Sequence, residues 1–411
     1  MGLPLRARVA TSLSRGIGAL SRATGRGDGS VIGGRVALRL DPDLLASLSA
    51  GRDVVLVSAT NGKTTTTRLT AAALGVLGPV ASNTFGANMP AGHVSALAQA
   101  GPTPYAVLEV DEHYLPHVTA ATKPRVIALL NLSRDQLDRA KEVALLAALW
   151  RETLREQRVH VVANADDPMV VWAASVVEDV CWVAAGQRWL DDSWVCPECG
   201  GGIRREGSPG GAVWECVTCG LRRPEPHWRL DGDTVVAPDG ARHRIELRLP
   251  GRVNRANAAI ALAVAAHFGV RPTDAVPRLA QIRSVAGRYT LVERDGRAIR
   301  LLLAKNPAGW LEAFEMADPT TTLLSINARA PDGFDTSWLY DVDFSPLRDR
   351  PVLITGERAF DLGVRLGVNG VPFTHVPSFA DGVAATRGRR LEVIANYTAF
   401  QQIRAELDRV D

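Results

Sequence analysis

The sequence lacks the features that would place it in several special classes of protein. It has no continuous apolar run of about 18 residues, so no membrane-spanning helix is predicted. The basic residues 1–27 have no continuous apolar stretch and no convincing cleavage site, which argues against a signal peptide. A formal net charge of only +3 gives no general reason to expect nucleic-acid binding. Its 411 residues, 46% of them hydrophobic, are typical of a globular protein with two or three domains.

Cysteine is scarce, and its placement is informative. Four of the five cysteines form two C-x-x-C pairs separated by 16 turn-rich residues. This spacing is typical of a zinc ribbon, in which four thiolates close a tetrahedral shell; a redox centre is the alternative. We expect the ribbon to be a structural insertion that lies away from the chemistry. The expected metal ligands are Cys196, Cys199, Cys216 and Cys219, whereas Cys181 is expected to be buried and inert.

The N-terminal segment admits two interpretations. Its arginines are interleaved with Leu, Val and Ile, which is the pattern of an amphipathic helix. Such a helix can pack on its own domain, or it can lie on an anionic membrane.

Short apolar segments alternate with helical ones along the chain. We expect strands at residues 53–58, 105–110, 125–131 and 159–164, and helices at 64–77 and 141–156. The alternation predicts an α/β fold whose mostly parallel sheet is covered on both faces. The expected domains are a short N-terminal segment (1–50), a central domain (51–290) with the ribbon at 193–228, and a smaller C-terminal α/β domain (291–411).

Residues 58–67, SATNGKTTTT, follow a predicted strand and begin a predicted helix. This is the setting of a P-loop, where backbone N–H groups bind phosphate, although Val57 breaks the strict pattern at its first position. Lys63 would reach the β- and γ-phosphates, and Thr64 and Glu109 would be ligands of Mg²⁺. Alternatively, Glu109 is only a satisfied carboxylate at a strand end. The expected ATP-binding residues of the loop are Thr60, Asn61, Gly62, Lys63, Thr64 and Thr65.

The T-N-G-K-T-T loop resembles that of the Mur ligases, ATP-dependent enzymes that join amino acids to peptidoglycan precursors. Residues 164–168, NADDP, are similar to the family's N-x-D-D-P turn. Residues 251–261, GRVNRANAAIA, are similar to its G-x-x-N-x-x-N-x-x-A helix, which implies that Asn254 and Asn257 contact adenine. By the same resemblance, Arg288 reaches toward the phosphates, and Lys305 contacts a phosphate or ribose unless it only begins a solvated helix.

Departures from the usual Mur ligase point to one branch of the family. About 50 residues precede the loop, too few for a domain that binds a UDP-linked substrate. Gln136 stands where a histidine is usual, and no lysine lies near Arg151 to be carbamylated. NTFGANMPAG (83–92), NLSRDQLDR (131–139) and DGFDTSWLYDVDF (332–344) resemble the synthetase subunits of lipid II isoglutaminyl synthase.

This resemblance implies an activity and a partner. The activity is ATP-dependent amidation of the D-isoglutamate α-carboxylate of lipid II, through an acyl-phosphate, at the inner face of the cell membrane. The ammonia comes from a GatD-like class I glutamine amidotransferase subunit. Asp335 or Asp341 completes that partner's Cys–His pair, and Trp338, Leu339 and Tyr340 between them suit an interface. Our alternatives are a stand-alone Mur-type or folylpolyglutamate-like ligase, and a zinc-ribbon module that binds nucleic acid.

Overall fold

The computed structural model describes residues 3–24, 31–83, 86–135, 143–207, 213–285, 288–294 and 296–408. It divides into two compact units, each described here by itself. Unit 1 comprises residues 1–132, 143–248 and 253–283. Unit 2 comprises residues 133–142, 249–252 and 284–411.

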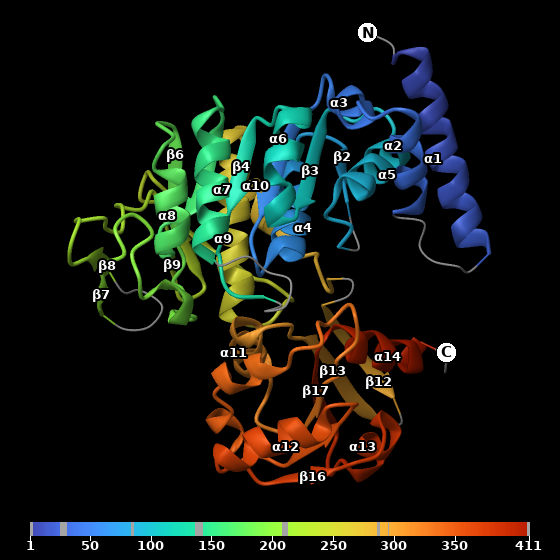
Figure 1. The fold of residues 1–411 in the computed structure, drawn as a ribbon, viewed down its shortest axis with the longest axis vertical. Helices are drawn as coiled ribbons and strands as arrows, with labels where there is room; N and C mark the ends of the chain where they lie inside the picture. Colours follow the sequence, from blue (N-terminus) through green and yellow to red (C-terminus); the bar gives the residue numbers. More distant parts are fainter. Residues whose placement is uncertain are drawn as a thin grey trace. The chain divides into compact units, whose positions relative to one another are not determined.

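Unit 1 is built on one large sheet (Figure 1). Among its described residues, nine strands lie in the order β11–β10–β9–β6–β5–β4–β1–β3–β2. Neighbours from β9 to β2 pair in parallel, whereas β10 pairs antiparallel with both β9 and β11. The strands are β1 (Asp53–Ser58), β2 (Val80–Ser82), β3 (Tyr105–Val110), β4 (Val126–Leu129), β5 (His160–Asn164), β6 (Val180–Ala184), β9 (Trp228–Asp231), β10 (Thr234–Val236) and β11 (Arg242–Arg244).

Both faces of this sheet are covered by helices, as the run of apolar residues in each strand predicts. Along β1, Val54 and Leu56 enter the core on one face, and Val55 and Val57 enter the core on the other. One face is covered by α5 (Pro90–Ala100), α6 (Leu115–Thr122), α7 (Val143–Arg155) and α8 (Pro168–Ala174), and the other by α4 (Lys63–Leu74), α9 (Arg252–His267) and α10 (Pro272–Leu279). The short 3-10 helix η1 (Glu112–Tyr114) follows β3.

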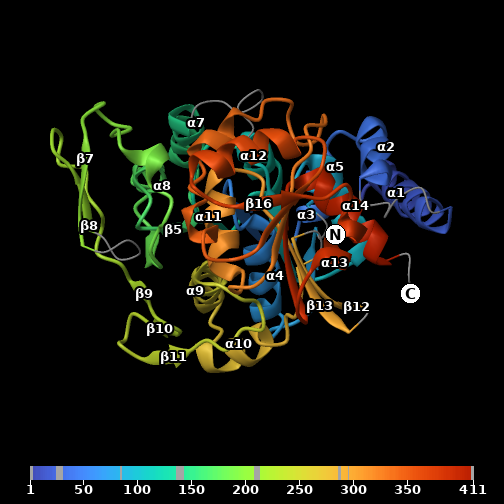
Figure 2. The ribbon, with the colours of Figure 1, turned by 90° about the horizontal axis from the view of Figure 1, so that it is seen from below.

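Three helices precede the sheet: α1 (Leu5–Ala23), α2 (Ile32–Leu40) and α3 (Leu44–Ser49). The buried face of α1 consists of small side chains, among them Ala7, Ala10 and Gly18. Figures 1 and 2 both place α1 at the outer edge of unit 1, beside α2 and at the opposite end from the cysteine-rich hairpin. That hairpin is the antiparallel pair β7 (Ile203–Glu206) and β8 (Val213–Cys216), preceded by η2 (Asp191–Ser193).

Unit 2 has its own sheet, with described strands in the order β12–β13–β17–β14–β15–β16. Only the β12–β13 pair is antiparallel in this described sheet. The strands are β12 (Tyr289–Arg294), β13 (Arg297–Leu303), β14 (Thr322–Ser325), β15 (Val352–Thr355), β16 (Phe373–His375) and β17 (Arg390–Ala395). The helices are α11 (Pro307–Met316), α12 (Ala359–Val368), α13 (Phe379–Ala385) and α14 (Tyr397–Asp408), with 3-10 helices η3 (Ser337–Asp341) and η4 (Ser345–Leu347).

The predicted interface role of two η3 residues is wrong. Trp338 and Leu339 are only 5% and 1% exposed, because the tight turn of η3 directs both side chains into the core of unit 2. The Trp338 ring lies 6.1 Å from that of Trp310, centroid to centroid. Tyr340 points outward and is 67% exposed, so it is the member of the three that is available to a partner.

Candidate nucleotide-binding site

The loop between β1 and α4 is closely held by its neighbours. Gly62 has φ of +85°, a conformation that favours glycine. A Cβ at this position would also lie 2.8 Å from Oδ1 of Asn257, on α9. Position 62 therefore requires glycine on two counts. The approach also places Asn257, expected from the sequence to contact adenine, directly beside the loop.

Asn131, just after β4, fixes the shape of the loop from the adjacent strand. Its Oδ1 accepts from the backbone N–H of Asn61 at 2.9 Å, and its Nδ2 donates to the Asn61 carbonyl at 3.0 Å. Its own carbonyl accepts from the N–H of Thr60, also at 3.0 Å. Three hydrogen bonds thus fasten two consecutive loop residues to the sheet, which presents the start of α4 in a fixed geometry.

Lys63 forms a buried ion pair with Glu112, the first residue of η1. Nζ lies 2.8 Å from Glu112 Oε2, and the two side chains are only 6% and 9% exposed. Nζ also donates to the carbonyls of Ala59 and Thr60. Burial raises the pKa of Glu112, and the neighbouring Lys63 charge opposes this effect. The Lys63 ammonium is therefore already at the loop. To bind a phosphate, it would have to leave the Glu112 carboxylate.

Glu109, near the end of β3, is held in place by its backbone. Its N–H donates to Asn83 Oδ1 at 2.7 Å, and its carbonyl accepts from Asn83 Nδ2 at 2.8 Å and from His93 Nε2 at 2.7 Å. Its side chain is 1% exposed, and among the described residues Oε2 has no hydrogen-bond partner. Buried carboxylate oxygens are normally satisfied, so this one fits a cation ligand.

His93 makes the stability of this site sensitive to acid. Burial lowers its pKa to about 4, so the ring stays neutral where histidine in the unfolded chain, with a pKa near 6.5, becomes protonated. The unfolded state then binds more protons, and stability falls as pH falls through this window, by roughly 3 kcal/mol in all. We expect His93→Gln, which keeps a donor for Glu109, to lose stability less steeply. Urea unfolding of both proteins at pH 7, 6 and 5 measures the difference; parallel slopes would contradict it.

The N-x-D-D-P turn after β5 is a structural brace. Asp167 is fully buried and accepts from the N–H groups of Leu132, Met169 and Val170 at 3.0, 2.9 and 3.3 Å. Burial raises its pKa to about 6. Asn164 Nδ2 donates to the Leu130 carbonyl at 2.8 Å. The turn therefore holds both residues that flank Asn131, and so supports the loop indirectly.

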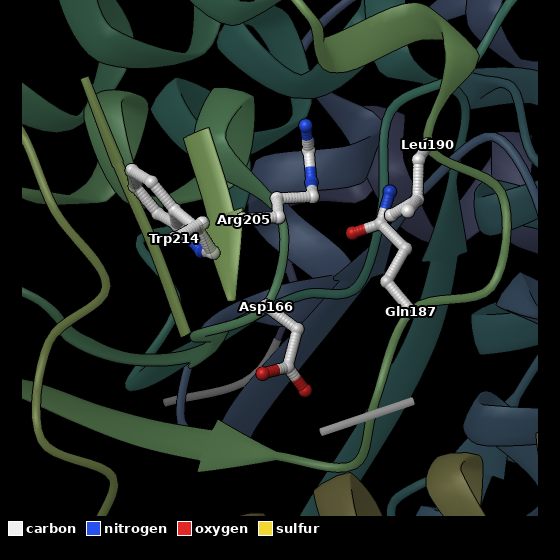
Figure 3. Close-up of a pocket in the computed structure, with 5 residues that line it drawn as sticks. All are labelled: Asp166, Gln187, Leu190, Arg205 and Trp214. Carbon is white, nitrogen blue, oxygen red and sulfur yellow. The ribbon is translucent and has the colours of Figure 1, made fainter. Parts of the chain in front are cut away.

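The cysteine ribbon is fastened to this same turn. Trp214 Nε1 donates to the Ala165 carbonyl at 3.0 Å, and Arg223 Nε lies 2.7 Å from Asp166 Oδ1. Asp166 Oδ2 accepts from the N–H of Ala185 at 2.9 Å. A small pocket lies at the junction, lined by Asp166, Gln187, Leu190, Arg205 and Trp214 (Figure 3). Hydrogen bonds thus join the ribbon to the turn, and the turn in its own right holds the residues on either side of Asn131.

The Arg223–Asp166 pair is expected to carry much of this attachment. The side chains are 14% and 4% exposed, so removing the guanidinium leaves a buried carboxylate without its ion-pair partner. Arg223→Met should lower the free energy of unfolding by about 3 kcal/mol, measured by urea denaturation. The adjacent Arg222 is exposed, and Arg222→Met is the matched control, expected to stay within about 0.5 kcal/mol of the wild type. Equal losses in the two variants would contradict the assignment.

The four ribbon cysteines converge as a metal site requires. Their Sγ atoms all lie within 4.8 Å of one another, with 3.7 Å between Cys196 and Cys219 and 3.5 Å between Cys199 and Cys216. The described residues contain no other group of three or more potential metal ligands of this kind. Cys181 is only partly buried, whereas full burial was expected, but desolvation still raises its pKa to about 11, so this thiol stays protonated at neutral pH.

The structure places the other predicted site residues as follows. Asn254 and Asn257 lie in α9, and the loop residues, with Glu109, line the carboxyl ends of β1 and β3. Arg288, Lys305, Asp335 and Asp341 belong to unit 2, and Gln136 lies outside the described residues. Three residues that hold the site, Asn83, His93 and Asn131, received no individual role from the sequence. The position of Asn131 as the last residue of a predicted strand was the signal that could have found it.

Comparison with known proteins connects these features. The Mur ligase middle domain matches residues 57–184, and the MurT ligase C-terminal domain matches residues 303–400. The chain is 28% identical to lipid II isoglutaminyl synthase (glutamine-hydrolyzing) subunit MurT of Streptococcus pneumoniae, over 92% of each chain. It is also 28% identical to the subunit of that name from Staphylococcus aureus, over 95% of each chain.

Solved structures agree on the fold. A pseudomurein peptide ligase type C from Methanothermus fervidus superposes with a TM-score of 0.70 at 18% identity. The alignment covers 90% of this chain and 81% of that one. The described residues contain no helix long and apolar enough to cross a membrane. The two matched domains, with relatives that are similar over 92–95% of the chain, show that this chain has a Mur ligase middle domain followed by a MurT ligase C-terminal domain and is similar to MurT subunits over nearly its whole length.

Proposed function

We propose that this chain is the synthetase subunit of a lipid II isoglutaminyl synthase, which converts the D-isoglutamate of lipid II to D-isoglutamine with ATP. One observation carries the proposal: a buried lysine lies at the start of the helix that a glycine loop opens, and on the neighbouring strand β3 the buried Glu109 has a carboxylate oxygen without a hydrogen-bond partner among the described residues. This arrangement suits a nucleotide and a divalent cation. Relatives that span nearly the whole chain bear the name of this synthase.

The chemistry needs activation, because a carboxylate is a poor electrophile. A carboxylate oxygen of the substrate attacks the γ-phosphorus of ATP, ADP leaves, and an acyl-phosphate forms. Ammonia then attacks the acyl carbon, and inorganic phosphate leaves with the electrons of the C–O bond. The proton lost from nitrogen passes to solvent.

The protein's part is positioning and charge neutralisation. Lys63 neutralises the β- and γ-phosphates once it leaves Glu112, and the N–H groups at the start of α4 bind phosphate oxygens. Thr64 and Glu109 would hold Mg²⁺, which adds further neutralisation of phosphate charge. Asn254 and Asn257 would contact adenine, Arg288 would reach toward the phosphates, and Lys305 would contact a phosphate or ribose.

We assign to Asp335 the role of completing the Cys–His pair of a glutaminase partner. Asp341 is engaged, since its Oδ2 lies 3.3 Å from Nη1 of Arg134. Asp335 is exposed, and its Oδ1 accepts from the Ser337 N–H at 2.8 Å, which fixes the carboxylate and keeps its pKa low. An ionised, oriented carboxylate is what a Cys–His pair on another chain requires. The partner would be a GatD-like class I glutamine amidotransferase.

An apolar surface beside Asp335 suits that partner. Along α12, Phe360, Val364 and Val368 are 77%, 60% and 71% exposed at a spacing of four residues, so they share one face of the helix. Tyr340 joins them from η3, with the Arg365 guanidinium 4.6 Å from its ring centroid. Exposed aromatic and aliphatic side chains gathered in this way are typical of an interaction site.

The ribbon metal is proposed to be Zn²⁺, because four cysteine thiolates suit its tetrahedral shell. Metal analysis should find one zinc per chain. Removal by a chelator should lower the melting temperature, because the ribbon has little core of its own and holds the turn at Asp166. Cys216→Ser should bind no zinc and melt at the chelated temperature even before chelator is added. Unchanged melting after complete zinc removal would contradict this role.

Reconstitution tests the function as a whole. The chain alone, given ATP, Mg²⁺, lipid II and a high concentration of ammonium, should form amidated lipid II. With glutamine in place of ammonium, product should appear only when a co-expressed glutaminase subunit is present. ATP turnover that instead requires an added amino acid, with neither ammonium nor partner, would establish the stand-alone ligase and overturn the proposal. Because lipid II is membrane-bound, the proposed place of work is the cytoplasmic face of the cell membrane.

A further inference from the structure

Helix α1 buries small residues and exposes large apolar ones, which is the reverse of the usual pattern in a globular protein. The residues that it buries are small: Ala7, Ala10, Thr11, Ser14 and Gly18. Most of its large apolar residues face outward, with Leu5, Val9, Leu13 and Leu20 exposed to 76%, 56%, 39% and 64%, while Ile17 is half-buried. A helix that only covers its own domain would bury its large apolar residues and expose polar ones.

The exposed apolar residues form one stripe. At roughly 100° per residue, Leu5, Val9, Leu13 and Leu20 fall within an arc of about 80°. The centre of this arc lies roughly 150° from the centre of the buried face. The stripe therefore points away from unit 1, and Figure 1 shows α1 at the outer edge of the unit with no other labelled element of that unit outside it.

Charge around the stripe is of one sign. Residues 1–40 contain seven arginines and one acidic residue, Asp28, and neither α1 nor α2 contains any acidic residue. This segment carries +6, although the net charge of the whole chain is +3, so the rest of the chain carries −3. Arg8 is exposed beside the stripe, and Arg6 Nε donates to the Leu40 carbonyl, which joins the end of α2 to this surface.

We propose that α1 is a docking surface for an anionic phospholipid membrane, with the helix parallel to the surface and its Leu5–Val9–Leu13–Leu20 stripe among the lipid headgroups. An apolar stripe flanked by arginines is the composition of an interfacial helix. Arginines near an anionic surface add attraction that salt weakens. A second copy of the chain fits less well, because a symmetric contact through this face would bring two arginine-rich segments together. The inference rests on α1 and not on the proposed reaction.

Flotation of the full chain with lipid vesicles tests the proposal. The chain should float with vesicles of mixed phosphatidylglycerol and phosphatidylcholine, and raising the salt concentration should release it. Vesicles of phosphatidylcholine alone should bind at least about tenfold more weakly. Equal, salt-insensitive binding to both kinds of vesicle, or no binding to either, would overturn the proposal.

Matched triple variants locate the binding surface. Leu5→Gln, Val9→Gln and Leu20→Gln together should weaken binding to anionic vesicles by at least about tenfold, since each removes apolar surface from the bilayer. The control replaces three exposed leucines elsewhere, Leu77, Leu145 and Leu291, with glutamine, and should bind as the wild type does. Circular dichroism verifies that both variants are folded.

Two results of this comparison would contradict the proposal that α1 docks on a membrane. If the α1 variant binds vesicles as tightly as the control, the stripe is not the docking surface. If the wild type is dimeric in solution, the α1 variant is monomeric and neither binds vesicles, the face is an interface between copies of this chain.

Discussion

Lys63→Met should reduce ATP-dependent amidation by roughly a thousandfold or more, because the charge that neutralises the transferred phosphoryl group is lost. It should also destabilise the protein by about 3–5 kcal/mol, since Glu112 stays behind as a buried carboxylate without its partner. A loss of activity in the single variant alone would therefore be ambiguous between chemistry and folding.

The double variant Lys63→Met/Glu112→Gln separates the two effects. Replacing both members of a buried ion pair with neutral side chains of similar size is often close to neutral for stability. We expect urea unfolding of the double variant to return to within about 1 kcal/mol of the wild type, while amidation stays absent. Lys123→Met, at an exposed lysine, is the control and should be fully active. Amidation in the double variant at near-normal rates would remove Lys63 from the mechanism.

Asp335→Asn should impair amidation that uses glutamine as the nitrogen source, but not amidation that uses ammonium. In complex with the glutaminase subunit, amidation from glutamine should fall by roughly two to four orders of magnitude, because an amide no longer holds a histidine in the orientation that the nucleophile needs. Amidation from ammonium should remain within about twofold of the wild type, since Asp335 lies outside the nucleotide loop. The exposed position of Asp335 makes misfolding an unconvincing explanation for such a result.

Asp341→Asn is the matched control for this prediction. It alters a carboxylate six residues further on and weakens the contact with Arg134, yet it should keep most glutamine-dependent activity. The reverse result, with Asp341 essential and Asp335 dispensable, would transfer the role to Asp341. Full glutamine-dependent activity in both variants would contradict the proposal that an aspartate of this chain completes the Cys–His pair of the glutaminase subunit.

The central strands were predictable because their residues are apolar on both faces. Residues 53–58 and 105–110 match β1 and β3 without a shift, and β4 and β5 differ from the prediction only at their ends. The three-residue β2 was not predicted, because a strand that short has no periodicity of its own. Its neighbour Asn83 nevertheless supplies two of the hydrogen bonds that hold Glu109.

The site was only partly predictable. Glu109, Asp111 and Glu112 stand together after one strand, and their spacing does not reveal which carboxylate meets Lys63. The 3-10 turn of η1 turns Glu112 toward the loop, while Asp111 caps that turn by accepting from the His113 N–H. The same limit applied to Asp335 and Asp341, because Arg134 lies some 200 residues away in the sequence and cannot be paired with either from spacing alone.

The role of the ribbon was hidden for a similar reason. Its cysteine spacing identifies a metal site, but Trp214 and Arg223 carry no motif that names Ala165 and Asp166 as their partners. Long-range contacts of this kind arise from the packing of the insertion on α8 and the turn before it. The sequence therefore indicates what the insertion is, and the structure indicates what it touches.

The contact between Gly62 and Asn257 has a consequence for biosynthesis. These residues are 195 positions apart in the sequence, so the loop leaves the ribosome long before the helix that completes it. At roughly 5–20 residues per second, the delay is about 10–40 seconds. Throughout that interval the apolar sheet face that α9 later covers remains exposed in the nascent chain. The nucleotide site is thus among the last features of unit 1 to form, and a chain truncated before residue 257 would be a target for chaperones rather than an ATP-binding fragment.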